Sequence, residues 1–289
     1  MDRFLESFTV RKCAFGLIDP AMAEKLPEGL TTQILVPKRL TSSSHLMPIL
    51  LDLRRESEDS WNDLIAWIRD EFKQSGRPPI ALFVTTDTNV DQFTRHWNAI
   101  QLAQPNSTRK LWLRVHDPRV LHQLLRILNI AQRRRLFGKS QAFHYWLGGT
   151  WLTAQRPIAD ESDNDCSSSG IVGWDWHRVE AIGLVNRALL GAGIYEASEL
   201  TSQAAVAEQL IERAVRRHGL IEQPDLVEFA ARGLLTVPTF DGHPVVIDAI
   251  RAVTGSAEDT RLSDCFALIE EKVWEALRCS TNLLTGQQT

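Results

Sequence analysis

The chain has 289 residues and a mass of 32.7 kDa, which is enough for two ordinary domains or one large domain. Hydrophobic residues make up 44% and charged residues 24%, a balance that excludes a chain disordered throughout and a bundle of membrane helices. Residues 1–150 carry 21 basic and 15 acidic side chains (+6), and residues 151–289 carry 11 and 21 (−10). The two halves are therefore expected to face different partners or to attract each other.

The first half alternates apolar runs with helical patterns. Residues with helical apolar spacing predict one helix that starts at a capping box formed by Ser60 and Asp63, and another over 90–102. Because helices separate several strands, we expect an α/β lobe with a mixed, partly parallel sheet. The apolar runs that predict strands are residues 13–19, 32–36, 48–53, 80–85, 110–115 and 142–147.

Residues 110–137 read as a strand that leads directly into a helix. Asp117 is placed to accept backbone N–H groups as the N-cap, and Pro118 occupies the first helical position, where its missing N–H costs nothing. The predicted buried face of this helix consists of Val120, Leu121, Leu124, Leu125 and Leu128.

A segment rich in Asp, Ser and Gly, residues 156–173, shows no periodicity and predicts an exposed linker. It divides the α/β lobe, residues 1–155, from a smaller all-helical lobe, residues 174–289.

Within the helical lobe, one helix is expected over 203–218, ending at Gly219, and another takes Pro224 into its first turn. Ser256 and Asp259 predict the start of a further helix. Its apolar residues are Leu262, Phe266, Ile269, Val273 and Leu277.

Two glycine motifs resemble nucleotide-binding signatures without meeting their requirements. Gly138-Lys139-Ser140 resembles the end of a phosphate-binding P-loop, but Arg133 stands where its first glycine belongs, and no strand leads into it. Gly191 and Gly193 follow a helix, which favours a helix end and a turn over a dinucleotide site.

No spacing typical of a nucleophile and its base occurs, and the histidines His116, His122 and His144 are expected to be core or surface residues. We therefore expect no catalytic residue, no cofactor and no metal site.

A local basic patch comprises Arg126, the run 133–135 and Lys139. Such a run is usually the solvated face of a helix. Tryptophans can bind nucleic acid by stacking on bases, but Trp61 lies on an apolar helix face, where it is not free to do so. With a pI near 6.1, nucleic acid is not an expected partner.

Membrane insertion and export are not predicted. The longest uncharged stretch, residues 40–51, is too short and too polar to span a bilayer. The N-terminus carries Asp2, Arg3 and Glu6, unlike a secretory signal. The four cysteines form no CxxC pair, so neither disulfides nor a zinc site are signalled. We expect a cytoplasmic protein with reduced thiols and no membrane partner.

One block carries a family resemblance. The string from Arg114 to Leu121, the following Phe137-Gly138, and an aromatic strand ending near Trp146 and Trp151 resemble the effector adaptor, or chaperone, family of bacterial type VI secretion. Weaker likeness lies in the opening strand Phe15–Asp19 and in a C-terminal segment with His218-Gly219-Leu220, Asp225-Leu226 and Phe229. The family-motif residues, structural or in contact with a partner, are Arg114, Asp117, Pro118, Arg119, Leu121, Phe137, Gly138 and Trp146.

The resemblance implies a non-enzymatic adaptor that binds a cognate toxic effector and helps to load it onto the valine-glycine-repeat (VgrG) spike protein. In this family the N-terminal lobe is the common part, and the helical lobe is thought to select the client. For Asp117 and Arg119, helix capping and lobe packing are the expected roles. The alternative function is an uncharacterised α/β enzyme, a hydrolase or transferase with a helical cap, because a fold does not fix an activity.

Overall fold

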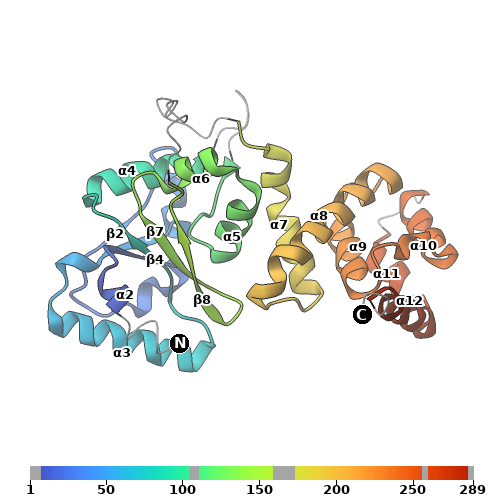
Figure 1. The fold of residues 1–289 in the computed structure, drawn as a ribbon, viewed down its shortest axis with the longest axis horizontal. Coiled ribbons are helices and arrows are strands. Elements are labelled where there is room, and N and C mark those ends of the chain that lie inside the picture. Colours follow the sequence, from blue (N-terminus) through green and yellow to red (C-terminus); the bar gives the residue numbers. More distant parts are fainter. Residues whose placement is uncertain (1–7, 104–110, 159–172, 256–259, 286–289) are drawn as a thin grey trace. The chain divides into compact units, whose positions relative to one another are not determined.

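The computed structural model describes residues 8–103, 111–158, 173–255 and 260–285. The chain divides into two compact units, Met1–Trp176 and His177–Thr289, called here the first unit and the helical unit (Figure 1). Most of the predicted linker, residues 156–173, lies outside the described residues, and the strand before it ends at Gln155.

The first unit is built on a six-stranded sheet with the strand order β2-β3-β1-β4-β7-β8, in which every neighbouring pair is antiparallel. Its strands are β1 (Phe15–Ile18), β2 (Thr32–Ile34), β3 (Ile49–Asp52), β4 (Ile80–Thr85), β7 (Ala142–Leu147) and β8 (Thr150–Gln155). A separate two-stranded antiparallel sheet pairs β5 (Leu102–Ala103) with β6 (Leu111–Trp112).

The prediction of a partly parallel sheet is wrong. A helix does connect β3 to β4, and these strands run in the same direction, because each is antiparallel to β1. However, β1 lies between them in the sheet, as in a split β-α-β arrangement, so the two parallel strands never pair. Helices between two strands therefore do not make those strands a parallel pair, since β4 and β7 also pair antiparallel although three of the described helices lie between them in the chain.

One predicted strand is much shorter in the structure, and one strand was not predicted. The run at 110–115 forms strand only at Leu111–Trp112. Strand β8 was not predicted, although Gly148-Gly149 with φ of 57° and 79° forms the two-residue turn that a β-hairpin favours. This glycine pair is the signal that the sequence carried for the second strand of the hairpin.

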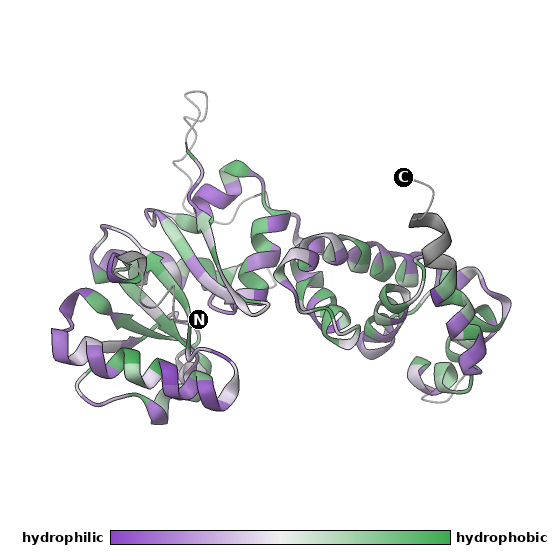
Figure 2. Ribbon diagram, turned by 60° about the horizontal axis from the view of Figure 1, so that its bottom comes forward, coloured by the Kyte–Doolittle hydropathy of each residue, from purple (hydrophilic) through white to green (hydrophobic). Residues whose placement is uncertain are grey.

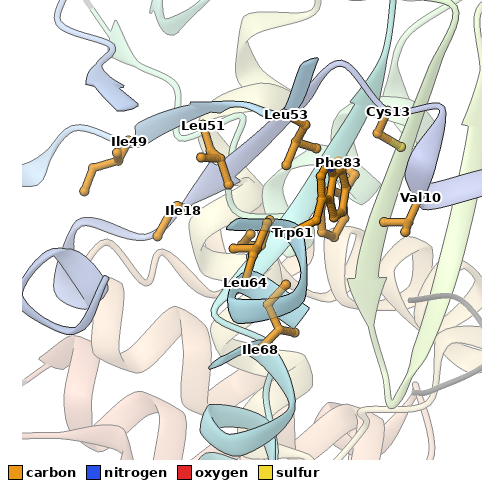
Figure 3. Close-up of a cluster of buried hydrophobic side chains, with 11 residues drawn as sticks. Val10, Cys13, Ile18, Ile49, Leu51, Leu53, Trp61, Leu64, Ile68 and Phe83 are labelled. Carbon is orange, nitrogen blue, oxygen red and sulfur yellow. The ribbon is translucent and has the colours of Figure 1, made fainter. Parts of the chain in front are cut away.

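Helices cover both faces of the sheet. On one face, Trp61, Leu64 and Ile68 of α3 pack into a buried cluster with side chains such as Ile18 and Phe83 (Figure 3). The helices of the first unit are α2 (Phe8–Arg11), α3 (Glu58–Ser75), α4 (Val90–Gln101), α5 (Pro118–Ile127) and α6 (Ile130–Phe137), with 3-10 turns at Pro20–Lys25, Thr41–Leu46 and Leu53–Arg55.

On the opposite face, aromatic side chains join α4 and α6 to the sheet. Phe93 lies 4.6 Å from Phe15, ring to ring, and Phe137 stacks on Phe143 at 4.3 Å. Helix α5 packs on β7. The central strands are coloured mostly at the hydrophobic end of the scale, and hydrophilic and hydrophobic residues alternate along the helices of both units (Figure 2).

Helix α3 begins three residues earlier than the capping box Ser60/Asp63 predicts. Its N-cap is Ser57, whose side chain accepts a hydrogen bond from the Ser60 backbone N–H. Ser60 is therefore the third helical residue, because Glu58 and Asp59 already supply the acidic first turn that a helix N-terminus favours.

The helical unit contains α7 (Trp176–Gly191), α8 (Ala197–His218), α9 (Gln223–Leu235), the 3-10 turn Phe240–Gly242, α10 (Pro244–Gly255), α11 (Leu262–Ala267) and α12 (Glu271–Thr285). Gly219 ends α8 with φ of 69°, and Pro224 lies in the first turn of α9, as predicted. Gly191 ends α7 and Gly193 forms a turn.

The last predicted helix differs from the structure. Ser256 and Asp259 lie outside the described residues, and the apolar stripe that was assigned to one helix is divided between α11 and α12. Between them, Leu268 is 86% exposed, whereas Phe266 and Trp274 on either side are buried and pack edge to face at 5.4 Å. The break lets both aromatic rings reach one core.

Candidate functional site

Asp117 in the family motif is the N-cap of α5, as predicted. Its Oδ1 accepts hydrogen bonds from the Arg119 backbone N–H at 3.0 Å and from Arg119 Nε at 3.1 Å, and its Oδ2 accepts one from the Arg119 guanidinium at 2.8 Å. Pro118 is the first helical residue. Burial by itself raises the pKa of the Asp117 carboxyl, but the hydrogen bonds and charge of Arg119 outweigh it, so the pKa lies below its usual value.

The two charged residues of this motif are thus largely paired with each other. The Asp117 side chain is only 12% exposed, while that of Arg119 is 54% exposed. More than half of the Arg119 side chain therefore remains accessible to water or to a protein partner, even though its hydrogen bonds to Asp117 serve the fold.

Arg114 is exposed, and its guanidinium lies 5.9 Å from the ring of Trp112. Its neighbour His116 is 6% exposed, and neither of its ring nitrogens has a hydrogen-bond partner among the described residues. Burial, reinforced by the charge of Arg114, lowers the pKa of His116 to about 4, so the imidazole is neutral at pH 7.

Two of the apolar motif residues belong to the core, and Trp146 is partly buried. Leu121 and Phe137 are fully buried. Trp146 projects to the face of the sheet that α3 covers, where its ring meets Phe72 edge to face at 5.5 Å and Trp151 at 5.6 Å. Leu121 and Phe137 thus stabilise the first unit from its core, and Trp146 is partly buried beside α3.

Gly138 has two reasons to be glycine. Its φ of 57° and ψ of −119° are strained for other residues, and a Cβ there would lie 2.6 Å from His96 Nε2. His96 Nε2 donates a hydrogen bond to the Leu136 carbonyl oxygen at 3.0 Å, and burial lowers the pKa of this histidine. Gly138 therefore lets the end of α6 pack directly against α4.

The basic patch serves the fold in part. Arg133 Nε donates a hydrogen bond to the carbonyl of Leu128, which is the C-cap of α5, and Arg126 Nε donates one to Gln123 Oε1. The patch and the rejected P-loop segment meet at Lys139, which is exposed.

A cavity of about 350 Å³ opens at the carboxyl end of β4. It is lined by Thr88 from the β4–α4 loop, by one side of α4 and by the turn between α6 and β7. The lining residues are Thr88, Gln92, Phe93, Arg95, His96, Gly138, Lys139 and Ser140. Gly138 is the one family-motif residue at this cavity. The sequence analysis did not single out Arg95 or His96, because only the packing of α4 against α6 places them beside Gly138.

His144 and His122 contribute hydrogen bonds to the fold of the first unit. His144 bridges three strands, with Nε2 3.0 Å from Thr85 Oγ1 and Nδ1 2.9 Å from Thr153 Oγ1. His122 Nδ1 lies 3.1 Å from the Tyr145 hydroxyl. Burial lowers the pKa of both histidines and raises that of Tyr145 to about 12, so these bonds join neutral groups at pH 7.

The C-terminal residues that carry the resemblance also act within the fold. His218 Nε2 lies 2.8 Å from Oδ2 of Asp241, a carboxylate that is 1% exposed and is also 3.0 Å from the Arg213 guanidinium. Asp225, in α9, accepts a hydrogen bond from the backbone N–H of Leu262 at 2.9 Å and so caps α11. Phe229 is fully buried. These residues connect α8, α9 and α11.

Within the described ranges, no three His, Cys, Asp or Glu side chains lie close enough together to hold a metal ion. Nor does any helix in those ranges combine the length and the apolar character needed to cross a membrane.

No curated protein and no solved structure matches this chain. A family model does match part of it, over residues that begin at β1 and end within α6. The matched part contains β1 to β6 and α3 to α5, together with the Asp117 motif, and does not reach β7, β8 or the helical unit. Residues 15–135 are thus similar to the family described as Domain of unknown function (DUF4123).

Proposed function

We propose that this protein is a non-enzymatic adaptor that binds a cognate toxic effector and helps to load it onto the VgrG spike of a type VI secretion apparatus. The observation that carries the proposal is the block from Arg114 to Leu121, which resembles the adaptor family and falls within the region of the family match. The adaptor family was long catalogued only as a domain of unknown function, and the matched family carries such a description.

The chemistry of the motif supports recognition over catalysis. Asp117 is held by Arg119, and the described histidines near it are neutral, buried or bonded within the sheet. An adaptor acts through shape, apolar contacts and charge complementarity, which need no activated nucleophile.

The two units are assigned different tasks. In the proposal, the first unit performs the task common to the family, contact with the spike, and the helical unit selects the effector. The charge asymmetry supports this division, since the basic first half and the acidic second half present fields of opposite sign.

The test is co-expression of the full chain with the protein encoded beside it and with VgrG, followed by purification through a tag on the chain. We expect a complex that contains all three proteins, and loss of effector secretion when the chain is deleted from its host. Turnover of a small molecule by the purified chain, without capture of either protein, would contradict the adaptor and support the alternative enzyme.

A variant set separates binding from folding. Arg119→Gln removes the partly exposed guanidinium but leaves Asp117 in place as the N-cap of α5. The matched control is Arg77→Gln, at an exposed arginine outside the motif. Weaker capture of VgrG by the first variant alone, at equal thermal stability, would place the spike contact at the motif.

A further inference from the structure

The turn between α6 and β7 forms one wall of the cavity at the carboxyl end of β4, with α4 as the opposite wall. Two cationic side chains, Arg95 and Lys139, line this cavity, and no carboxylate does. Neither side chain makes an ion pair or a hydrogen bond within the described part of the chain. Two cations that share a cavity without a counter-charge favour the entry of an anion.

Neutral donors complete the lining. Ser140 is 2% exposed as a residue, its hydroxyl makes no hydrogen bond to another described residue, and it lies on the same wall as Lys139. Gln92 adds a side-chain amide from the first turns of α4. Charged and neutral donors that converge from two elements can hold more than one oxygen of an anion.

The site does not depend on the backbone at the start of α4. The backbone N–H of Gln92 already donates to Asn89 Oδ1 at 2.9 Å, which is the N-cap bond of this helix. The nearby acid Asp87 accepts a hydrogen bond from Gln141 Nε2 at 2.5 Å and is not part of the lining. Side chains, not the helix terminus, therefore make this cavity attractive to an anion.

The wall is fixed by packing. Gly138 lets the ring of His96 occupy the space of a side chain, and the His96 hydrogen bond to Leu136 holds the turn against α4. Burial keeps His96 neutral, so the charge of the cavity at pH 7 comes from Arg95 and Lys139. A rigid wall lowers the conformational cost of binding.

From this geometry we propose that the cavity between α4 and the α6–β7 turn binds an oxyanion, a carboxylate or a phosphate group, through Lys139, Arg95 and Ser140. The segment Gly138-Lys139-Ser140 would thus meet an anion without forming a P-loop, because side chains replace the backbone cradle. This inference is independent of the adaptor proposal.

The test is a titration of the full chain, labelled with nitrogen-15, at constant ionic strength. One arm uses inorganic phosphate and the other N-acetyl-glutamate amide, with N-acetyl-glutamine amide as the neutral control. We expect saturable shifts of the backbone amide signals of Gln92, Gly138 and Ser140 with one or both anions and none with the neutral compound. The arm that saturates at the lower concentration identifies the preferred group.

Variants locate the binding. Lys139→Gln should raise the dissociation constant about tenfold, because the anion loses one charge-assisted contact. Arg95→Gln and Ser140→Ala should also raise the dissociation constant. Lys38→Gln, at an exposed lysine outside the cavity, should leave it unchanged. Absence of saturable shifts with both anions, or equal weakening by Lys38→Gln and Lys139→Gln, would overturn the proposal.

Discussion

Burial makes His116 expensive to protonate. Its pKa falls to about 4 because the ring is desolvated and lies near Arg114, and the opposing charges of Asp117 and Asp19 offset this only in part. In the unfolded chain a histidine titrates near its ordinary value of about 6.5. Between these two values the unfolded chain binds the additional proton, so the free energy of unfolding decreases as the pH falls from about 6.5 to about 4.

His116→Leu should therefore reduce the loss of unfolding free energy between pH 6.5 and pH 4. The reduction is roughly 3 kcal/mol at most, because the pKa of His116 falls from about 6.5 in the unfolded chain to about 4 in the folded protein. Leucine fills the apolar site without unpaired nitrogens. The measurement is urea unfolding at pH 7 and pH 4.5, with the exposed His45→Leu as control. An unchanged difference between the two pH values in the His116 variant would refute the assignment. His96, His122 and His144 retain part of the dependence, because burial lowers their pKa values as well.

At the scale of elements, two glycines in helices of the helical unit have opposite surroundings. Gly183 in α7 is exposed, and a Cβ there would meet nothing within 4 Å. Gly233 in α9 is buried, and a Cβ there would lie 2.7 Å from Leu210 and 3.1 Å from Phe240, which are both buried.

Gly183→Ala should stabilise the protein by up to about 1 kcal/mol, the helix propensity gain of alanine. Gly233→Ala gains the same propensity but overpacks the core, which costs about 1–3 kcal/mol, so its net effect is destabilising. Thermal unfolding of both variants checks the prediction. Equal stabilisation by the two substitutions would show that α8 and α9 are not in close contact at Gly233.

The cap of α5 gives a second prediction at this scale. Asp117→Ala should lower the free energy of unfolding by about 0.5–2 kcal/mol, because the Arg119 backbone N–H loses its acceptor. Asp117→Asn keeps an oxygen acceptor and should be nearly silent, since Arg119 is more than half exposed and its ion pair is weak. Chemical denaturation measures both variants. If Asp117→Asn left stability intact but abolished capture of a partner, the carboxylate would contact that partner directly.

For the whole molecule, the acidic second half should steer the effector towards the helical unit. Glu199, Glu222 and Glu275 are exposed and make no ion pair with another described residue, so these carboxylates contribute to the field in solution. Steering by charge appears mainly in the association rate and weakens as salt screens charges beyond about 8 Å at physiological ionic strength.

Neutralising these three acids together, to Gln, should slow effector association several-fold at low salt and leave the dissociation rate nearly unchanged. The matched control neutralises three exposed acids of the first unit that likewise make no ion pair with a described residue, Glu24, Glu28 and Asp63. Surface-based kinetics at two salt concentrations measure both rates. A slower association in the control variant instead would assign client recognition to the first unit.

The sequence by itself determined the local features whose physics is contained in neighbouring residues. The cap of α5 by Asp117, the end of α8 at Gly219 and the amphipathic core faces of α3 and α4 follow from backbone hydrogen bonding and helical periodicity. The most specific part of the family resemblance likewise lies in one contiguous block, Arg114 to Leu121.

Only the tertiary structure decided which distant segments become neighbours. The parallel strands β3 and β4 do not pair because β1 lies between them, and β4 pairs antiparallel with β7, which follows after three described helices; no local pattern encodes either neighbour. The cavity exists because Gly138 admits the ring of His96, which brings Arg95 and Lys139 to one opening from segments more than forty residues apart. Such sites depend on long-range packing, which the sequence specifies collectively and not through any single motif.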